Sequence, residues 1–169
     1  MKILVFSDSH GSTRVMSKAI DQHLRNGGVD YVFFLGDGIR DIETISCEFP
    51  QISIDTVFGN SDCGFTTYET LANAVYEKTV VVGGIRFLLM HGHKFDVKST
   101  YQRAGDYAIA KKADVLLFGH THRAEDITID GSDSGHIRMI NPGSCGMYNG
   151  SFALLNVVNR QVVCGFGKY

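Results

Sequence analysis

Two histidines, His120 and His122, follow the apolar segment Val115–Phe118 and a glycine, with one threonine between them. Imidazole is the commonest metal ligand in proteins, and it gains or loses a proton near neutral pH. A single histidine at the end of a strand is usually solvated or hydrogen-bonded to backbone, so only neighbouring ionisable groups give this pair a chemical meaning. Four further apolar segments also end in Asp, Asn or His, and the residues concerned are Asp8, His10, Asp37, Asn60, Asp62, His91 and His93.

The first part of the chain alternates predicted strands with predicted helices. Residues 2–7, 31–35 and 52–58 are apolar and rich in β-formers, which indicates buried strands. Ser12 is the predicted N-cap of a helix that ends at Gly27 and Gly28, and residues 39–48 predict a second, shorter helix. This βαβαβ order predicts a parallel sheet with helices on its outside.

The second part of the chain is richer in strands. Residues 78–82 and 85–90 flank Gly83 and Gly84 and predict a hairpin, residues 100–112 predict a helix, and residues 115–118 predict a strand. Short strands are predicted over residues 127–129, 137–140, 152–158 and 161–166, with a turn at Asn141 to Ser144. So many strands in a short chain predict two packed sheets with helices on their outer faces.

The loops after these strands are expected to meet, because sites in open α/β sheets form at the carboxyl ends of the strands. Carboxylate and imidazole donors together suit divalent transition metals. One ion would leave donors over, so we expect two divalent transition ions, with manganese as the first candidate and nickel, cobalt, iron or zinc as alternatives. The expected metal ligands are Asp8, His10, Asp37, Asn60, His91, His120 and His122.

Donor chemistry suggests how these ligands divide between the two ions. Asp8 and His10 lie close enough in sequence to reach one ion, which His122 would complete. Asp37 has two carboxylate oxygens and is the candidate bridge between the ions. The second ion would be completed by Asn60, His91 and His120. The neutral amide oxygen of Asn60 keeps the site positive enough to attract an anionic substrate.

Length and composition define a broad class of protein. The chain has 169 residues, which fits a single domain spanning residues 1–169. Its net charge is -2 with scattered Lys and Arg, so it lacks the basic footprint of a nucleic-acid-binding protein. The four cysteines lie far apart without C-x-x-C spacing, which favours neither a thiolate zinc site nor a disulfide framework.

Sequence features also bear on location and assembly. The first apolar run is too short for the core of a signal peptide. No later segment approaches the roughly 18 apolar residues that cross a bilayer. We therefore expect a cytoplasmic protein without membrane partners, and leave its oligomeric state open, with a homodimer or a larger assembly as one option.

Five short sequence motifs resemble those of the calcineurin-like metallophosphoesterases and occur in the same order along the chain. They are D-x-H at Asp8 and His10, G-D at Asp37, G-N-x-D at Asn60 and Asp62, H-G-H at His91 and His93, and G-H-x-H at His120 and His122. The small size and the Asn-Pro-Gly-Ser segment look most like the compact prokaryotic phosphodiesterase branch of that family. The resemblance implies a four-layer αββα sandwich of two mixed β-sheets flanked by helices, a dinuclear metal site and hydrolysis of phosphate esters.

Metal chemistry and the resemblance both support in-line attack of a metal-bound, bridging hydroxide on a small phosphate ester, and the resemblance implies that the protein is a phosphodiesterase. The residues expected to act in catalysis are Asp37, Asn60, Asp62 and His93. The resemblance implies that Asp62 orients a histidine ligand or Asn60, whereas His93 has either a supporting role or that of a proton donor. This chain has Ser61 where the family often has a histidine that resembles a general acid, which predicts weak cleavage of esters with alkoxide leaving groups.

Other functions stay open on sequence grounds. The same site could serve a phosphomonoesterase or a nucleotide phosphohydrolase, for which Phe65 and Tyr68 are the aromatic candidates and Arg123 is a candidate phosphate contact. The phosphoesterase fold also resembles a eukaryotic retromer subunit that acts as an interaction scaffold with a degraded metal site. Every expected ligand position here holds a competent donor, which favours an enzyme over such a scaffold.

Overall fold

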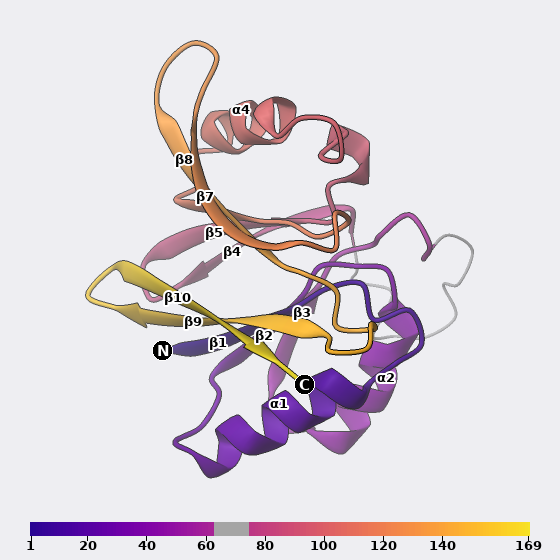
Figure 1. Cartoon of the computed structure of the whole chain (residues 1–169). Coiled ribbons are helices and arrows are strands. Elements are labelled where there is room, and N and C mark those ends of the chain that lie inside the picture. Colours follow the sequence, from indigo (N-terminus) through magenta and orange to yellow (C-terminus); the bar gives the residue numbers. More distant parts are fainter. Residues whose placement is uncertain (63–74) are drawn as a thin grey trace.

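Two five-stranded sheets pack face to face, with helices on both outer sides (Figure 1). The computed structural model of the chain describes residues 1–62 and 75–169. Cys63 and the aromatic candidates Phe65 and Tyr68 lie outside the described residues.

The first sheet contains the βαβαβ unit that the sequence predicts. It comprises, with its helices, β1 (Lys2–Phe6), α1 (Arg14–Arg25), β2 (Tyr31–Phe34), α2 (Ile39–Glu48), β3 (Ser53–Thr56), β9 (Ser151–Val158) and β10 (Gln161–Lys168). The strand order is β10-β9-β1-β2-β3, in which β1, β2 and β3 are parallel and β9 is antiparallel to both of its neighbours. Helices α1 and α2 cover the outer face of this sheet (Figure 1).

The second sheet is also mixed. It comprises, with its helices, β4 (Glu77–Val82), β5 (Ile85–Met90), η1 (His93–Phe95), α4 (Gln102–Ala110), β6 (Val115–Leu117), β7 (Ala124–Asp130) and β8 (His136–Pro142). The strand order is β4-β5-β6-β8-β7, in which β5, β6 and β8 are parallel. Helix α4 covers its outer face (Figure 1).

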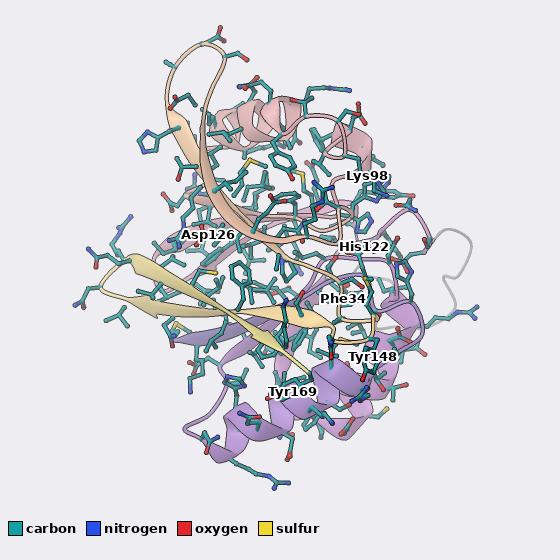
Figure 2. The ribbon with its side chains drawn as sticks, viewed as in Figure 1. Phe34, Lys98, His122, Asp126, Tyr148 and Tyr169 are labelled. Carbon is teal, nitrogen blue, oxygen red and sulfur yellow. The ribbon has the colours of Figure 1, made fainter. Side chains whose placement is uncertain are left out.

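The central strands are buried on both faces, which explains their continuous apolar sequences. Along β1, Ile3 and Val5 belong to the core between the sheets, whereas Leu4 and Phe6 pack on the side of α1 and α2. Strand β5 alternates in the same way between the central core and the core beneath α4. Side chains fill the space between all layers (Figure 2). The four-layer αββα sandwich that the sequence predicts is therefore confirmed.

Three local predictions need correction. Helix α1 begins after Thr13, which makes no side-chain capping hydrogen bond, and the N–H of Ser12 donates to the carbonyl of Ser9 (2.9 Å) instead. Strand β3 spans Ser53–Thr56 rather than residues 52–58, and beyond its end the N–H of Val57 still donates to the carbonyl of Phe34 (3.1 Å) while Val57 forms an isolated bridge with Val75. Strand β7 is longer than predicted, and its first residues pair with Asn141 and Pro142, which therefore belong to β8 rather than to a turn.

Two further observations bear on the predicted class of protein. No helix in residues 1–62 or 75–169 is long and apolar enough to cross a membrane. Cys47, Cys145 and Cys164 are free thiols. Cys145 is buried, and burial raises the pKa of its thiol, so it is an unreactive core residue.

Candidate metal centre

The seven predicted ligands lie on loops that directly follow strands of the two sheets. Asp8 and His10 follow β1, Asp37 follows β2, Asn60 follows β3, His91 follows β5, and His120 and His122 follow β6. Contacts among these side chains bring all five loops to one edge of the sandwich. The sequence prediction that these loops meet is thereby supported, with ligands drawn from both sheets.

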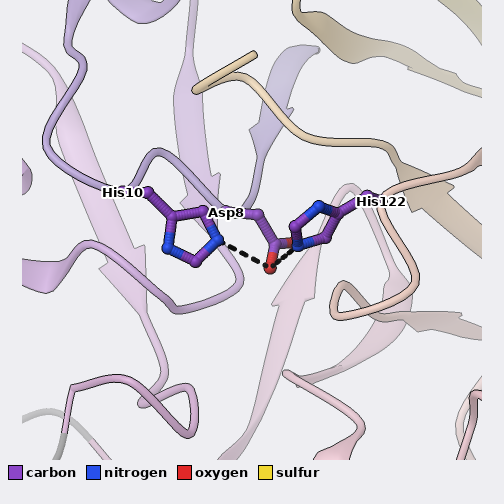
Figure 3. Close-up of side chains that lie close together, drawn as sticks. All are labelled: Asp8, His10 and His122. Atoms are coloured by element: carbon purple, nitrogen blue, oxygen red, sulfur yellow. Dashed lines mark ion pairs between the residues drawn. The ribbon is translucent and has the colours of Figure 1, made fainter.

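One group of donors consists of Asp8, His10 and His122, whose donor atoms lie within 4.8 Å of one another. The Asp8 carboxylate lies between the two imidazoles (Figure 3), with its Oδ1 3.1 Å from Nε2 of His122 and 3.9 Å from Nε2 of His10. Within the described part of the chain, this buried oxygen accepts no hydrogen bond. A buried carboxylate oxygen without a hydrogen bond is costly. The arrangement therefore fits a divalent cation.

A second group consists of Asp37, His91 and His120, again with donor atoms within 4.8 Å. The Nδ1–H of the buried His91 donates to the carbonyl of Leu35 (2.7 Å), so that Nε2 is the ring nitrogen that faces the other donors. Burial lowers the pKa of His91, but the hydrogen bond to Asp37 and the charge of Asp8 raise it above its usual value, so a bound cation would displace a proton from Nε2. This Nε2 lies 3.2 Å from Oδ1 of Asn60, 3.2 Å from Nδ1 of His120 and 3.5 Å from Oδ2 of Asp37. Nitrogen and oxygen donors that converge in this way fit a second divalent cation.

The two groups share one carboxylate between them. Oδ2 of Asp37 lies 3.5 Å from Nε2 of His91 in the second group and 4.0 Å from Nε2 of His10 in the first. This is the position that the predicted bridging role of Asp37 requires. Burial raises the pKa of Asp37, but hydrogen bonds from His91 and Ser61 outweigh burial and lower the pKa below its usual value. The carboxylate is thus ionised and able to bind cations at neutral pH.

The protonation state of His120 also suits a metal ligand. Burial, the nearby His91 and Lys98 lower the pKa of His120 to about 4. At neutral pH the ring is therefore uncharged, as metal binding requires. The backbone N–H of His120 donates to Oδ2 of Asp8 (3.1 Å), which ties the loop after β6 to the loop after β1.

Five of the seven candidate ligands have left-handed backbone conformations. The φ angles are 56° for Asp8, 46° for His10, 59° for Asp37, 69° for His120 and 60° for His122. Such angles are uncommon outside glycine, although Asp and His tolerate them better than most residues. They turn the chain sharply at the ends of the strands, and hydrogen bonds from neighbouring loops must hold them.

Asp62 supplies many of these hydrogen bonds, although in a different way from the one predicted. Its two oxygens accept the backbone N–H groups of Asp37 (2.7 Å), Gly38 (2.8 Å), Ile39 (3.0 Å) and Gly59 (2.8 Å). These contacts hold the loop of Asp37 and the residue before Asn60. Asp62 was expected to orient a histidine ring or the Asn60 side chain, but it binds backbone N–H groups of the ligand loops instead.

Ser61 contacts a ligand directly. Its N–H donates to Oδ1 of Asp37 (2.7 Å) and its hydroxyl donates to Oδ2 of the same carboxylate (3.0 Å). A cavity of about 210 Å³ opens beside these residues and is lined in part by His10, Asp37 and Ser61. The serine therefore combines a contact to the candidate bridge with a place on the wall of this cavity.

His93 lies beside the second group. Its ring centroid is 5.4 Å from that of His91 and 6.2 Å from that of His120. Its Nδ1 is buried and has no hydrogen-bond partner among the described residues. Burial, His91 and Lys94 lower the pKa of His93. Its position agrees with a role near the site, and its part in catalysis stays a prediction.

Sequence reasoning missed the importance of Asn141 and Ser144. Buried Asn141 donates through Nδ2 to the carbonyl of Gly119 (2.9 Å) and to Oγ1 of Thr121 (3.0 Å), next to both histidines after β6. The Ser144 hydroxyl donates to the carbonyl of Asp8 (2.8 Å). The sequence did contain a signal for these two residues. Asn141 lies at the end of the apolar strand β8 and Ser144 lies just after it, and the candidate ligands likewise follow strands.

Comparisons with known proteins agree with this fold and site. The profile of the calcineurin-like phosphoesterase superfamily domain matches residues 1–160. A probable metallophosphoesterase of Mycoplasma pneumoniae is 34% identical over 146 residues, which cover 85% of this chain and 78% of that protein. The probable metallophosphoesterase YsnB of Bacillus subtilis is 30% identical over 171 residues, 98% of this chain and 90% of that protein. The chain therefore belongs to the calcineurin-like phosphoesterase superfamily.

Solved structures share the fold. A predicted phosphoesterase of Streptococcus pneumoniae aligns with a TM-score of 0.74 at 24% identity, over 99% of this chain and 88% of the other. A mutant of Vps29 from Entamoeba histolytica aligns with a TM-score of 0.68 at 22% identity, over 100% and 99% of the two chains. An archaeal phosphodiesterase aligns with a TM-score of 0.64 at 24% identity, over 98% and 99%.

Proposed function

We propose that the protein is a phosphodiesterase that holds two divalent transition ions, with manganese as the first candidate. The observation that supports this most strongly is the pair of donor groups that meet at the Asp37 carboxylate. The first ion would be held by Asp8, His10 and His122, and the second by Asn60, His91 and His120, with Asp37 between them. Bound ions would acidify water to supply the nucleophile and would neutralise negative charge on the phosphate group.

The charges of the ligands prepare the site for an anionic substrate. Asp8 and Asp37 bring the only two formal negative charges among the seven ligands, because the other five are imidazoles or an amide. Two divalent ions would leave the centre with net positive charge. Asn60 contributes an oxygen without adding negative charge. Phosphate esters are thus attracted electrostatically to the cavity beside His10 and Asp37.

The preference for a diester over a monoester is the finer part of the proposal. At neutral pH a phosphomonoester carries more negative charge than a diester and gains more from additional cationic side chains. One arginine, Arg40, lines the cavity beside Asp37, so a monoester is the alternative substrate class. The fold shared with an archaeal phosphodiesterase is compatible with this preference. The fold shared with Vps29 is equally compatible with a scaffold, but the full set of metal donors favours catalysis.

The chain's own residues have defined tasks in this proposal. The Leu35 carbonyl orients His91, Ser61 orients Asp37, and Asp62 holds the backbone of two ligand loops. His93, whose ring lies beside His91 and His120, is the candidate to exchange a proton with the departing group. None of these residues forms a covalent bond to the substrate.

The decisive experiment assays metal-free protein that has been reconstituted separately with Mn, Ni, Co, Zn or Mg. Substrates are mono- and diesters that share the p-nitrophenolate leaving group. We expect no turnover without metal, and a kcat/KM for the diester at least about 10-fold above that for the monoester. Equal hydrolysis by chelated and reconstituted protein would refute the metal mechanism, and preference for the monoester would assign the alternative phosphomonoesterase function.

A further inference from the structure

Asp41 links helix α2 to the loop that carries two candidate ligands. It lies in the first turn of α2, and its Oδ2 accepts hydrogen bonds from the Ser9 hydroxyl (2.5 Å) and from the N–H of Gly11 (2.9 Å). Ser9 and Gly11 are the two neighbours of His10, and Ser9 also follows Asp8. One carboxylate oxygen therefore binds the side chain on one side of His10 and the backbone on the other.

The loops after β1 and β2 pack closely at Gly38, where a larger residue would force a neighbouring side chain to move. Gly38 has a φ of 142°, and a Cβ atom there would lie 1.9 Å from Oγ of Ser9 and 3.1 Å from the backbone nitrogen of His10. The N–H of His10 donates to the carbonyl of Asp37 (3.1 Å). The Asp41 contacts therefore belong to a tight junction between the loops after β1 and β2.

The first donor group depends on such support more than the second. The side chains of His10 and His122 are 41% and 37% exposed, and their Nε2 atoms lie 3.9 Å and 3.1 Å from Oδ1 of Asp8, a member of the same group. In the second group, by contrast, His91 is fully buried and bound to Leu35. The position of His10 is consequently determined by its backbone, which has a left-handed φ of 46°.

We infer that Asp41 is a positioning residue for the first metal site, formed by Asp8, His10 and His122, and that the second site assembles without it. This inference rests on the proposed two-ion function. Asp41 does not belong to the first donor group, and its Oδ2 instead accepts hydrogen bonds from both neighbours of His10. Loss of the Asp41 carboxylate lets the His10 loop relax and weakens one ion selectively.

The experiment is a calorimetric titration of metal-free protein with Mn²⁺, combined with elemental analysis after gel filtration. Residues that support metal ligands typically contribute about 10–100-fold to affinity. We expect Asp41→Ala to weaken one of two sites by about 10-fold or more. Asp41→Asn, which keeps an acceptor oxygen, and Ser9→Ala, which removes one donor, should have smaller effects. The exposed ion-pair residue Asp21 provides a control, since Asp21→Asn should titrate like the wild type.

Two reference variants identify the affected site. His10→Ala removes a ligand of the first site, and His120→Ala removes a ligand of the second. Asp41→Ala should not change Mn²⁺ affinity further in the His10→Ala protein, but should lower it in the His120→Ala protein. If Asp41→Ala does not fold, Asp41→Asn and Ser9→Ala are compared in the same way, and their smaller losses should fall on the first site alone.

The outcomes separate this inference from the proposed function. A wild type that saturates with fewer than two ions refutes the proposed function. A wild type with two ions, together with Asp41 variants that titrate unchanged or lose both sites equally, refutes the role of Asp41 alone. The role of Asp41 is supported if the Asp41 variants lose only the site that His10→Ala also removes.

Discussion

His91 donates a hydrogen bond from Nδ1 to the carbonyl oxygen of Leu35 over 2.7 Å, and this bond joins the two sheets of the sandwich at the candidate metal centre. His91 follows β5 of the second sheet, and Leu35 follows β2 of the first. The bond occupies Nδ1, so a contact between sheets determines that Nε2 is the ring atom that faces the other ligands.

His91→Ala should therefore remove one ion and destabilise the fold. The buried Leu35 carbonyl would lose its partner, which costs about 1–3 kcal/mol of the free energy of unfolding. We expect elemental analysis to find one Mn²⁺ per chain and kcat/KM for an aryl diester to fall about 100-fold or more. His136→Ala, at an exposed residue of β8, is the matched control and should change neither quantity.

Asp37→Asn should weaken both ions together, since a neutral amide cannot bridge two cations as a carboxylate does. Asparagine keeps the size of the side chain and an acceptor for the Ser61 N–H. Titration with Mn²⁺ should show both binding steps shifted to higher concentration, whereas Asp133→Asn, in the exposed loop between β7 and β8, should leave them unchanged. An Asp37→Asn protein that loses a single step would contradict the bridging role.

Ser61 should make turnover sensitive to the leaving group. A serine hydroxyl is a poor proton donor near neutral pH, and here it already donates to Asp37. We expect log kcat/KM for the wild type to fall steeply as the pKa of the leaving group rises. Ser61→His should flatten this dependence, because general acid catalysis supplies about 10²–10⁴-fold for poor leaving groups.

Ser61→Ala is the control that separates the two roles of this residue. It removes the hydroxyl bond to Asp37 without adding a proton donor, so the slope should stay steep while Mn²⁺ affinity decreases. A shallow slope in the wild type would show that another acid acts, and His93 would be the first residue to substitute.

Asn141 should stabilise the loop that carries His120 and His122. Asn141→Ala leaves the carbonyl of Gly119 without its side-chain donor, which should lower the free energy of unfolding of the metal-free protein by about 1–3 kcal/mol. Urea denaturation measures this change, and Asn156→Ala, at a half-buried position on β9, serves for comparison. Equal stability of the two variants would argue against the importance of the Asn141 contacts.

The sequence by itself determined the layers of the fold and the candidate ligands. Strands that are buried on both faces have continuous apolar sequences, which are recognisable without a structure. The residues that follow these strands, such as Asp8 and His91, are of types that commonly bind metals. Both signals depend only on residues that are close together in the chain, so a single sequence is enough to detect them. The order of parallel strands then brings the loops to one edge of the sandwich.

Only the tertiary structure decided how these residues are held. Asp62 binds the backbone of residues 24 and 25 positions away, Ser144 reaches the Asp8 carbonyl across 136 positions, and Asp41 accepts from the Ser9 hydroxyl 32 positions away. Most of these partners are backbone N–H or carbonyl groups, which nearly every residue carries. The type of a residue does not predict such a contact, so the contact can be identified only from the folded structure, in which the loops lie together.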